Sequence, residues 1–493
     1  MAATLIDIEN VDQCLKHKTL DISHYKQERL EKAKGNIPGT QAIYVRTFGC
    51  SHNISDSEVM MGLLSEYGYL ITDAPQDADL WLINSCTVKN PSQDAMMTYV
   101  KNAKEQAKGL VVAGCVPQGD RNLKELEGVS VVGVTQIDRI VEVVEQTLAG
   151  NTVKLLAKKT LPSLDLPKIR KNKLVEIIPI STGCLGSCSY CKTKHARGHL
   201  GSYPVENIVN RVIDSTKEGV KDVWLTSEDS GAYGRDIGSS LPALLTEIVK
   251  VLPKDCMLRV GMTNPPFILE HLEAMSKLLN HPNVYSFLHI PVQSGNNEVL
   301  GNMVREYTIE DFCKVVDTIR KNVKDAYIAT DIICGFPGET EEQFEDTMNL
   351  VRKYKFPSLY ISQFYPRPGT AAAKMKRVPT QEVKQRSRQL TKLFESYTCF
   401  DKLKGQIVQV FLRDFEEAKE QNMMVGHTKA HVKVLLPRHD ELIGGSVYAY
   451  ITETSKWHVT GRIVEKPKNF NLAFASVFVV FIALFLFYIL TFN

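Results

Sequence analysis

The stretch Gly183-Cys-Leu-Gly-Ser-Cys-Ser-Tyr-Cys191 decides the fold class of this chain. Its thiols follow a C-x3-C-x2-C spacing and belong to Cys184, Cys188 and Cys191. Three thiolates this close together suit a cubane iron–sulfur cluster in which one iron stays open to a small molecule. For this loop alone zinc is the alternative, because His195 and His199 follow closely and zinc requires a fourth ligand.

Strands and helices alternate from Val175 onward. The candidate strands are 175–181, 222–227, 257–262, 284–291, 326–334 and 358–364, with helical stretches such as 205–217 and 309–323 between them. This alternation is typical of a parallel sheet covered by helices. Six β/α units are two fewer than a closed eightfold barrel needs, so residues 175–401 are predicted to form an open, partial (β/α)6 barrel. The first strand delivers the cysteine loop at its carboxyl end.

Three similar units precede the barrel and predict a parallel α/β domain over residues 41–150. Their strands cover 42–48, 79–84 and 110–113, and each strand ends near a cysteine: Cys50, Cys86 and Cys115. Each of these cysteines taken singly is typical of a buried free thiol. Ligands of parallel sheets bind at the carboxyl ends of the strands, however, so we expect the three to converge. The pattern predicts a second three-cysteine cluster.

The remaining segments complete an α/β multidomain chain. Residues 1–40 form a polar extension, and residues 151–174 form a basic linker. Short β segments at 406–412, 427–436, 445–451 and 457–463 predict a small antiparallel β-barrel over residues 402–464. Barrels of this kind often bind oligonucleotides, although the fold alone does not establish that use.

The carboxy-terminal run 472–492 is apolar and uncharged over 21 residues. About 20 such residues cross a bilayer, so the run predicts a transmembrane helix. Lys466 and Lys468 precede it, as on a cytosolic flank. We therefore expect a single-pass, tail-anchored protein of the endoplasmic reticulum membrane, with its catalytic domains in the cytosol.

Composition narrows the function classes less than the motifs do. The 44% hydrophobic share is that of a folded protein, and a net charge of +3 is too small to indicate nucleic-acid binding by itself. The 11 cysteines show no repeating disulfide spacing, and residues 1–18 lack the apolar core of a signal peptide. Reduced thiols in a reducing compartment are therefore expected, rather than disulfides.

From residue 41 to 464 the chain resembles the methylthiotransferase family of radical SAM enzymes. The amino-terminal motifs are Thr47-Phe-Gly-Cys-Ser-His-Asn-Ile-Ser-Asp-Ser-Glu58, Asn84-Ser-Cys-Thr87 and Gly114-Cys115. The barrel motifs include Leu225-Thr-Ser-Glu-Asp-Ser-Gly-Ala-Tyr233, His289-Ile-Pro-Val-Gln-Ser-Gly295, Met303-Val-Arg305 and Thr330-Asp-Ile-Ile-Cys-Gly-Phe-Pro-Gly338. The small barrel is similar to a TRAM domain, which helps to hold RNA in this family. The second residue of the cluster loop, Leu185, departs from the commoner Asn or Asp without changing a ligand.

The resemblance implies two [4Fe–4S] clusters and S-adenosyl-L-methionine as cofactors. Cys184, Cys188 and Cys191 would hold the radical SAM cluster, and Cys50, Cys86 and Cys115 would hold the auxiliary cluster. One molecule of S-adenosylmethionine would methylate a sulfur on the auxiliary cluster, and another would supply the radical for its insertion. Glu228 and Gln293 are expected to contact the cofactor or the substrate base, with a structural hydrogen bond as the equal alternative. Asn53 and Asn84 are candidates for orienting the auxiliary-cluster loops.

The implied substrate is tRNA, through its anticodon stem-loop. The stretch Ser227-Glu-Asp-Ser-Gly-Ala-Tyr233 and the apolar carboxy terminus resemble the branch that modifies C2 of N6-threonylcarbamoyladenosine. Residues 374–392 carry seven basic residues and one acid, which favours phosphate binding beside a TRAM-like barrel. An electron donor is also required. The alternatives are isopentenyladenosine tRNA or a ribosomal protein side chain as substrate, and a non-catalytic iron–sulfur regulator.

Overall fold

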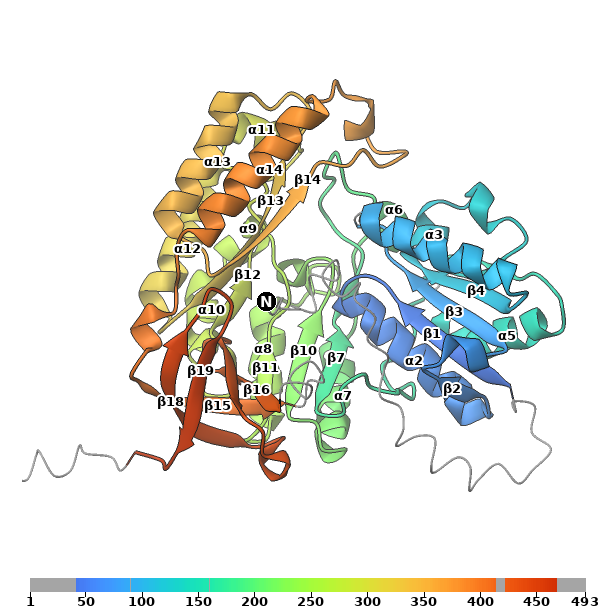
Figure 1. Ribbon diagram of the computed structural model, residues 1–493, viewed down its shortest axis with the longest axis horizontal. Coiled ribbons are helices and arrows are strands. Elements are labelled where there is room, and N and C mark those ends of the chain that lie inside the picture. Colours follow the sequence, from blue (N-terminus) through green and yellow to red (C-terminus); the bar gives the residue numbers. More distant parts are fainter. Residues whose placement is uncertain (1–40, 89, 159, 414–421, 468–493) are drawn as a thin grey trace, which may run out of the picture.

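The computed structural model describes residues 41–88, 90–158, 160–413 and 422–467, which form three folded parts (Figure 1). The amino-terminal domain, in blue, and the small barrel, in red, lie on different sides of the central partial barrel.

The amino-terminal domain is a parallel sheet in the order β2-β1-β3-β4-β5-β6. The three strands that precede the cysteines are neighbours in this sheet: β1 (Ala42–Thr47), β3 (Leu80–Ser85) and β4 (Gly109–Gly114). The other strands are β2 (Leu70–Thr72), β5 (Ser130–Val132) and β6 (Lys154–Leu155). Helices α2 (Ser51–Tyr67) and α5 (Ile140–Leu148) pack on one face of the sheet, and α3 (Asn90–Glu105) packs on the other. Alternating apolar side chains along each strand supply both cores.

The central domain is a partial barrel of six parallel strands. One sheet contains β7 (Val175–Pro179), β10 (Asp222–Thr226) and β11 (Met257–Arg259), and the other contains β12 (Phe287–His289), β13 (Tyr327–Cys334) and β14 (Ser358–Gln363). A parallel bridge between Leu258 and Val284 joins the two sheets. Outer helices share one core with the strands; they are α7 (Val205–Lys217), α8 (Leu241–Val251), α10 (Leu272–Leu279), α12 (Ile309–Asn322), α13 (Glu341–Tyr354) and α14 (Thr380–Glu395).

The small domain is a closed barrel in the order β15-β16-β17-β19-β18. Its strands are β15 (Ile407–Arg413), β16 (Met423–Thr428), β17 (Lys433–Pro437), β18 (Ser446–Thr454) and β19 (Val459–Val464). It docks where the central strands begin, because Arg413 pairs with Asp222 at 3.2 Å and the main chain of Lys429 bonds that of Ser286 at 2.8 Å. The opposite, carboxyl ends of the central strands stay available for a site.

The stretch expected to be a basic linker is partly built into the fold. Lys154–Leu155 is strand β6 of the first sheet. Lys168 and Arg170 are buried against Glu176, which also pairs with Arg211 at 3.0 Å. These cations hold the pKa of Glu176 at about 2, although burial alone would raise that pKa. Two of the linker's positive charges therefore act inside the protein, not on RNA.

The fold class is corrected at its carboxy-terminal end. We expected residues 472–492 to form a transmembrane helix, and this segment lies outside the described residues. No helix in the described part of the chain is both long enough and apolar enough to cross a membrane. The described architecture is two α/β domains and a small β-barrel.

Candidate active site

The C-x3-C-x2-C loop lies at the carboxyl end of the first barrel strand. It follows the short strand β8 (Ser181–Thr182) and ends at α6 (Thr193–Arg197). Gly183 enters the loop with φ 78°, and a Cβ there would lie 2.0 Å from the carbonyl oxygen of His199, so only glycine fits. The amide of Ser189 donates to the carbonyl of Met303 at 2.9 Å, which ties the loop to the segment between β12 and β13.

The second cysteine set gathers at the carboxyl edge of the first sheet. Cys86 and Cys115 directly follow β3 and β4, and Cys50 lies three residues after the end of β1. Asn53 joins their loops, because its Nδ2 donates to the carbonyls of Phe48 at 2.8 Å and Ser85 at 2.9 Å. Its Oδ1 lies 3.7 Å from the Sγ of Cys115. Asn84 in turn donates to the carbonyl of Asn53 at 2.8 Å, so both asparagines orient these loops as expected.

Both cysteine sets line a single cavity of about 300 Å³. Glu228 and Gln293 line it as well. Volumes of this order are typical of small-molecule sites. The amino-terminal domain and the barrel therefore each supply one wall, and chemistry at one cysteine set takes place within reach of the other.

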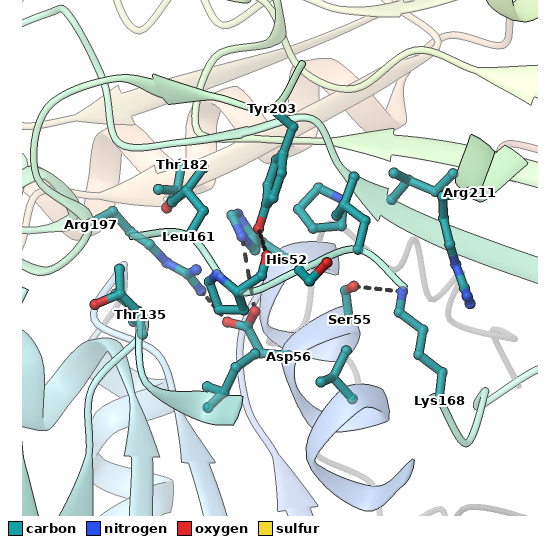
Figure 2. Close-up of a pocket in the computed structure, with 18 residues that line it drawn as sticks. His52, Ser55, Asp56, Thr135, Leu161, Lys168, Thr182, Arg197, Tyr203 and Arg211 are labelled. Carbon is teal, nitrogen blue, oxygen red and sulfur yellow. Dashed lines mark hydrogen bonds and ion pairs between the residues drawn. The ribbon is translucent and has the colours of Figure 1, made fainter. Parts of the chain in front are cut away.

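A buried ionic network connects the two walls, and Figure 2 shows three of its members, His52, Asp56 and Arg197, where they line a neighbouring pocket. Arg197 follows the barrel's cysteine loop, and its Nη2 donates to Asn53 Oδ1 at 2.8 Å and to Asp56 Oδ2 at 2.7 Å. Its Nε lies 3.6 Å from Glu228 Oε1, and His52 Nδ1 lies 3.0 Å from the same oxygen. Figure 2 shows His52 and Arg197 both directed at Asp56. The relative position of the two cysteine sets is thus fixed by buried, hydrogen-bonded side chains.

Glu228 and Gln293 have different surroundings in the cavity. Glu228 Oε2 accepts a hydrogen bond from the amide of Gly183 at 2.8 Å, next to Cys184. Burial alone would raise the pKa of this carboxyl, but His52 and Arg197 hold it below its ordinary value. Gln293 lies on the cavity wall with φ 68°, and its backbone bonds to Asp331 and Ile333. Glu228 therefore has structural bonds to both walls, while contact of either side chain with a cofactor or base stays a prediction.

A chain of polar groups behind Cys188 is not predicted by the sequence. Arg305 Nη1 donates to the Sγ of Cys188 at 3.1 Å, and its other nitrogen bonds Asn264. Asn264 Nδ2 donates to Asp229 at 2.7 Å. Burial raises the pKa of Asp229 to about 6 despite these bonds. Arg305 and Asp229 lie in the quoted motifs, but nothing in their spacing indicates that they share a partner.

The donor set fits iron–sulfur clusters. Burial raises the pKa of Cys115 to about 11 and that of Cys184 to about 12, so both thiols keep their protons at neutral pH while no metal is bound. Metal binding requires thiolates and therefore releases these protons. Among the residues that the structure describes, no group of three or more His, Cys, Asp or Glu side chains is arranged to hold one metal ion. A cubane distributes its thiolates over separate irons, whereas zinc draws all its ligands to one point. His195 and His199 are exposed and do not line the cavity, whereas the three thiols of the loop do.

Comparison with known families assigns the class of this protein. The family model described as the Radical SAM superfamily matches residues 178–351, which include Cys184, Cys188 and Cys191. A second model, described as Uncharacterized protein family UPF0004, matches residues 42–133, which include Cys50, Cys86 and Cys115. Fold and site together therefore define a radical SAM enzyme.

Similar proteins are named Threonylcarbamoyladenosine tRNA methylthiotransferase. The protein of Drosophila pseudoobscura pseudoobscura is 55% identical over 442 residues, covering 88% of this chain and 79% of that protein. The human protein is 53% identical over 453 residues, covering 90% and 78%, and that of Caenorhabditis elegans is 49% identical over 361 residues, covering 73% and 84%. This chain belongs to the radical SAM methylthiotransferase family. The expected cofactors, [4Fe–4S] clusters and S-adenosylmethionine, are confirmed by that membership.

The fold is similar to that of a solved structure. That structure is the radical S-adenosylmethionine methyltransferase TsrM from Kitasatospora setae, with cobalamin and a [4Fe-4S] cluster bound. The TM-score is 0.50 at 15% identity, over 68% of this chain and 77% of that one. At this identity the likeness supports the fold alone.

Proposed function

We propose that this chain attaches a methylthio group to C2 of N6-threonylcarbamoyladenosine beside the anticodon of tRNA. The observation that carries this proposal is the single cavity lined by both cysteine sets, in a chain more than half identical to proteins of that name. Sulfur insertion needs a radical source and a sulfur carrier within reach of one base. A shared cavity meets that need. A cluster used only for electron transfer would not have to share a cavity with the radical source.

The C2–H bond of adenine is neither acidic nor electrophilic enough for acid–base catalysis, so the protein relies on its cofactors for the hard chemistry. When bound, the clusters and S-adenosylmethionine supply radical, methyl group and sulfur. Cys184, Cys188 and Cys191 hold one cluster, and Cys50, Cys86 and Cys115 hold the other. The chain's own part is to fix both sets, through Arg197 and Asn53, on the walls of one cavity.

The RNA must present its base from outside the stack. A cavity at the carboxyl ends of the strands cannot admit a duplex, so an unpaired loop with an extruded adenosine is the fitting form of substrate. The small β-barrel supports this role as a TRAM-like RNA-binding unit. It docks at the other end of the central strands, so it holds the RNA at a distance from the chemistry.

Nucleoside mass spectrometry of tRNA from cells with and without this chain tests the reaction. Loss of the gene should remove the methylthio form of threonylcarbamoyladenosine and leave the unthiolated nucleoside. Loss of methylthio-isopentenyladenosine, or of a methylthio group on a ribosomal protein, would assign the enzyme to an alternative substrate instead. Unchanged nucleosides and proteins would leave only the regulatory alternative.

Cluster assignment is tested by anaerobic reconstitution. Replacing Cys184, Cys188 and Cys191 with alanine should remove about half of the bound iron and abolish cleavage of S-adenosylmethionine, since each [4Fe–4S] site depends on its own thiolates. Replacing Cys50, Cys86 and Cys115 should remove the other half and leave some abortive cleavage. A single cluster in the unmutated protein would contradict the assignment.

We also propose that an electron donor supplies the radical SAM cluster, and that residues 41–467 act in the cytosol, where tRNA and a reducing compartment coincide. Location at the endoplasmic reticulum membrane stays a prediction from residues 472–492, which lie outside the described residues. Protease treatment of intact microsomes measures the side on which the domains lie, and their protection would place them in the lumen.

A further inference from the structure

Exposed apolar side chains gather on the loops around the cavity. The described residues include seven large hydrophobic side chains that are exposed, and four of them lie on these loops. They are Val88 at 54%, Leu185 at 39%, Val304 at 47% and Tyr365 at 36% exposure. Val88 and Val304 line the cavity itself. Single exposed apolar residues are ordinary, but a group at one opening indicates a binding surface.

Hydrogen bonds join these loops into one rim. The amide of Ser189, in the loop of Leu185, donates to the carbonyl of Met303, beside Val304, at 2.9 Å. The carbonyl of Ser189 accepts from the amide of Ala372 at 2.9 Å, in the segment that follows Tyr365. In that same segment Arg367 donates to Thr87 Oγ1 at 2.9 Å, beside Val88. We call Val88, Leu185, Val304 and Tyr365 the apolar rim.

Val304 occupies a backbone position that favours glycine. Helix α11 (Asn297–Asn302) ends in a Schellman motif, because the amide of Arg305 donates to the carbonyl of Leu300 and that of Val304 to Gly301, both at 2.9 Å. Val304 is the left-handed residue of this motif, with φ 56°. A β-branched residue there is strained, and such strain is found at functional positions. The strain presents an apolar side chain at the cavity mouth.

The charge around the apolar rim fits a polyanion. Residues 183–199 and 357–381 contain no acidic residue. Lys374, Lys376 and Arg377 are exposed in the second stretch. Glu306, beside Arg305, is an exposed acid of the cavity wall. Aromatic side chains flanked by cations bind single-stranded nucleic acid, because bases stack on the ring while phosphates contact the cations, and Tyr365 is the aromatic residue of the apolar rim.

We propose that the apolar rim stacks the unpaired bases on either side of the target adenosine of the anticodon loop, and that Lys374, Lys376 and Arg377 bind the adjoining phosphates. This inference rests on the proposed function, since it names how that RNA enters the cavity. Stacking of the neighbouring bases keeps the loop open while the adenosine is extruded.

The test measures binding of an anticodon stem-loop RNA that carries threonylcarbamoyladenosine to the full chain with both clusters reconstituted. Tyr365→Ala should weaken binding about tenfold, within the range for one lost stacking contact, and Val304→Asn should weaken it less, because valine offers apolar contact but no aromatic face. Lys376→Ala should weaken binding and reduce its salt dependence, whereas the rim variants should leave the salt dependence unchanged.

Matched controls separate stacking from general damage. Tyr67→Ala and Ile237→Asn remove side chains of similar exposure, 37% and 43%, that do not line the cavity. Tyr67 ends helix α2, roughly 25 Å from its start at the cysteines. Both controls should bind the RNA as tightly as the unmutated chain. Val304→Asn should also keep its iron and unfold at no lower temperature, because asparagine tolerates positive φ.

Two outcomes separate a failure of the apolar-rim proposal from a failure of the proposed function. If the rim variants bind the RNA as tightly as the controls while the unmutated enzyme methylthiolates it, the apolar rim is not the platform and the proposed function stands. If the unmutated holoenzyme yields no methylthio product from this RNA, the proposed function itself fails.

Discussion

At the scale of single residues, the site depends on a few buried charges with more than one partner. Arg197 bonds two side chains of the amino-terminal domain, Asn53 and Asp56, and lies beside Glu228 of the barrel. Its side chain is 2% exposed. A buried charge of this kind adds little net stability while it is paired, but its removal leaves other buried charges without a partner. The network therefore specifies a position more than it adds stability.

Replacement of Arg197 should be severe. Arg197→Ala leaves Asp56 and Glu228 without their guanidinium, and removal of one partner from a buried pair costs about 3–5 kcal/mol. Denaturant unfolding of the apoprotein measures the loss, and iron retention of the holoprotein should fall at both clusters. Arg139→Ala is the matched control, because its ion pair with Glu142 is exposed and should contribute under about 1 kcal/mol. Equal effects of the two variants would contradict the proposed role of the network.

Arg305 should tune the radical SAM cluster. A cationic donor 3.1 Å from the Sγ of Cys188 stabilises added negative charge, and hydrogen bonds to cluster sulfur raise the reduction potential. Arg305→Met should therefore lower the potential of that cluster and leave the auxiliary cluster unchanged. A redox titration followed by electron paramagnetic resonance measures both. A shift in both potentials, or in neither, would count against this local effect.

The sequence predicted the cysteines of the site and the two asparagines beside one set, but not the charged groups that join the two sets. Cysteines in one strand-end position of neighbouring β/α units converge because parallel strands share an edge, so Cys50, Cys86 and Cys115 could be grouped in advance. Arg197 could not be paired with Asp56, because 141 residues separate them and no local pattern encodes that contact.

At the scale of elements, the segment before β7 shows how composition misleads. Its lysines and arginines predicted a basic linker, but Lys168 and Arg170 form buried ion pairs with Glu176. Strand β6 is only two residues long, too short for any periodicity to reveal. The segment also packs against helix α2, because the amide of Lys171 donates to Glu58 Oε1 at 2.9 Å. The apolar run 472–492, by contrast, had a clear pattern but lies outside the described residues.

Glu58 should make stability depend on pH. Burial raises its pKa from 4.5 to about 7, with Glu176 adding to the rise and Lys168 opposing it. Between these pH values the folded state binds more protons than the unfolded state, so stability falls as pH rises from about 4.5 to 7. Glu58→Gln keeps an acceptor for the amide of Lys171 but has no carboxyl to titrate. The stability of this variant relative to the parent protein should therefore rise as the pH rises across this window. Thermal unfolding of the apoprotein at pH 5 and pH 8 measures the difference, and an equal midpoint difference at both pH values would contradict it.

At the scale of the whole molecule, the central barrel is engaged at both ends of its strands. The amino-terminal domain meets the carboxyl ends through the cavity, and the small barrel meets the amino ends. At that second contact the rings of His427 and His431 stack with centroids 4.4 Å apart. The ring of His431 also lies 4.8 Å from Tyr285 and 4.9 Å from Phe287 of the partial barrel. The docking surface of the small barrel thus contains two imidazoles among aromatic rings.

This contact should make the docked small barrel acid-sensitive. Burial, with the charges of Lys433 and Arg259, lowers the pKa of His427 to about 3, and burial beside His427 lowers the pKa of His431 well below its ordinary value of 6.5. Below pH 6.5 the unfolded state therefore binds more protons than the folded state, and stability falls as pH falls, by up to about 1.4 kcal/mol per pH unit for each imidazole. Replacing both, as His427→Gln with His431→Asn, should flatten the dependence between pH 4 and 6.5. Asparagine suits position 431 because its φ is 60°. Unfolding midpoints of the full chain across this range measure the slope, and an unchanged slope in the double variant would show that acid acts elsewhere in the molecule.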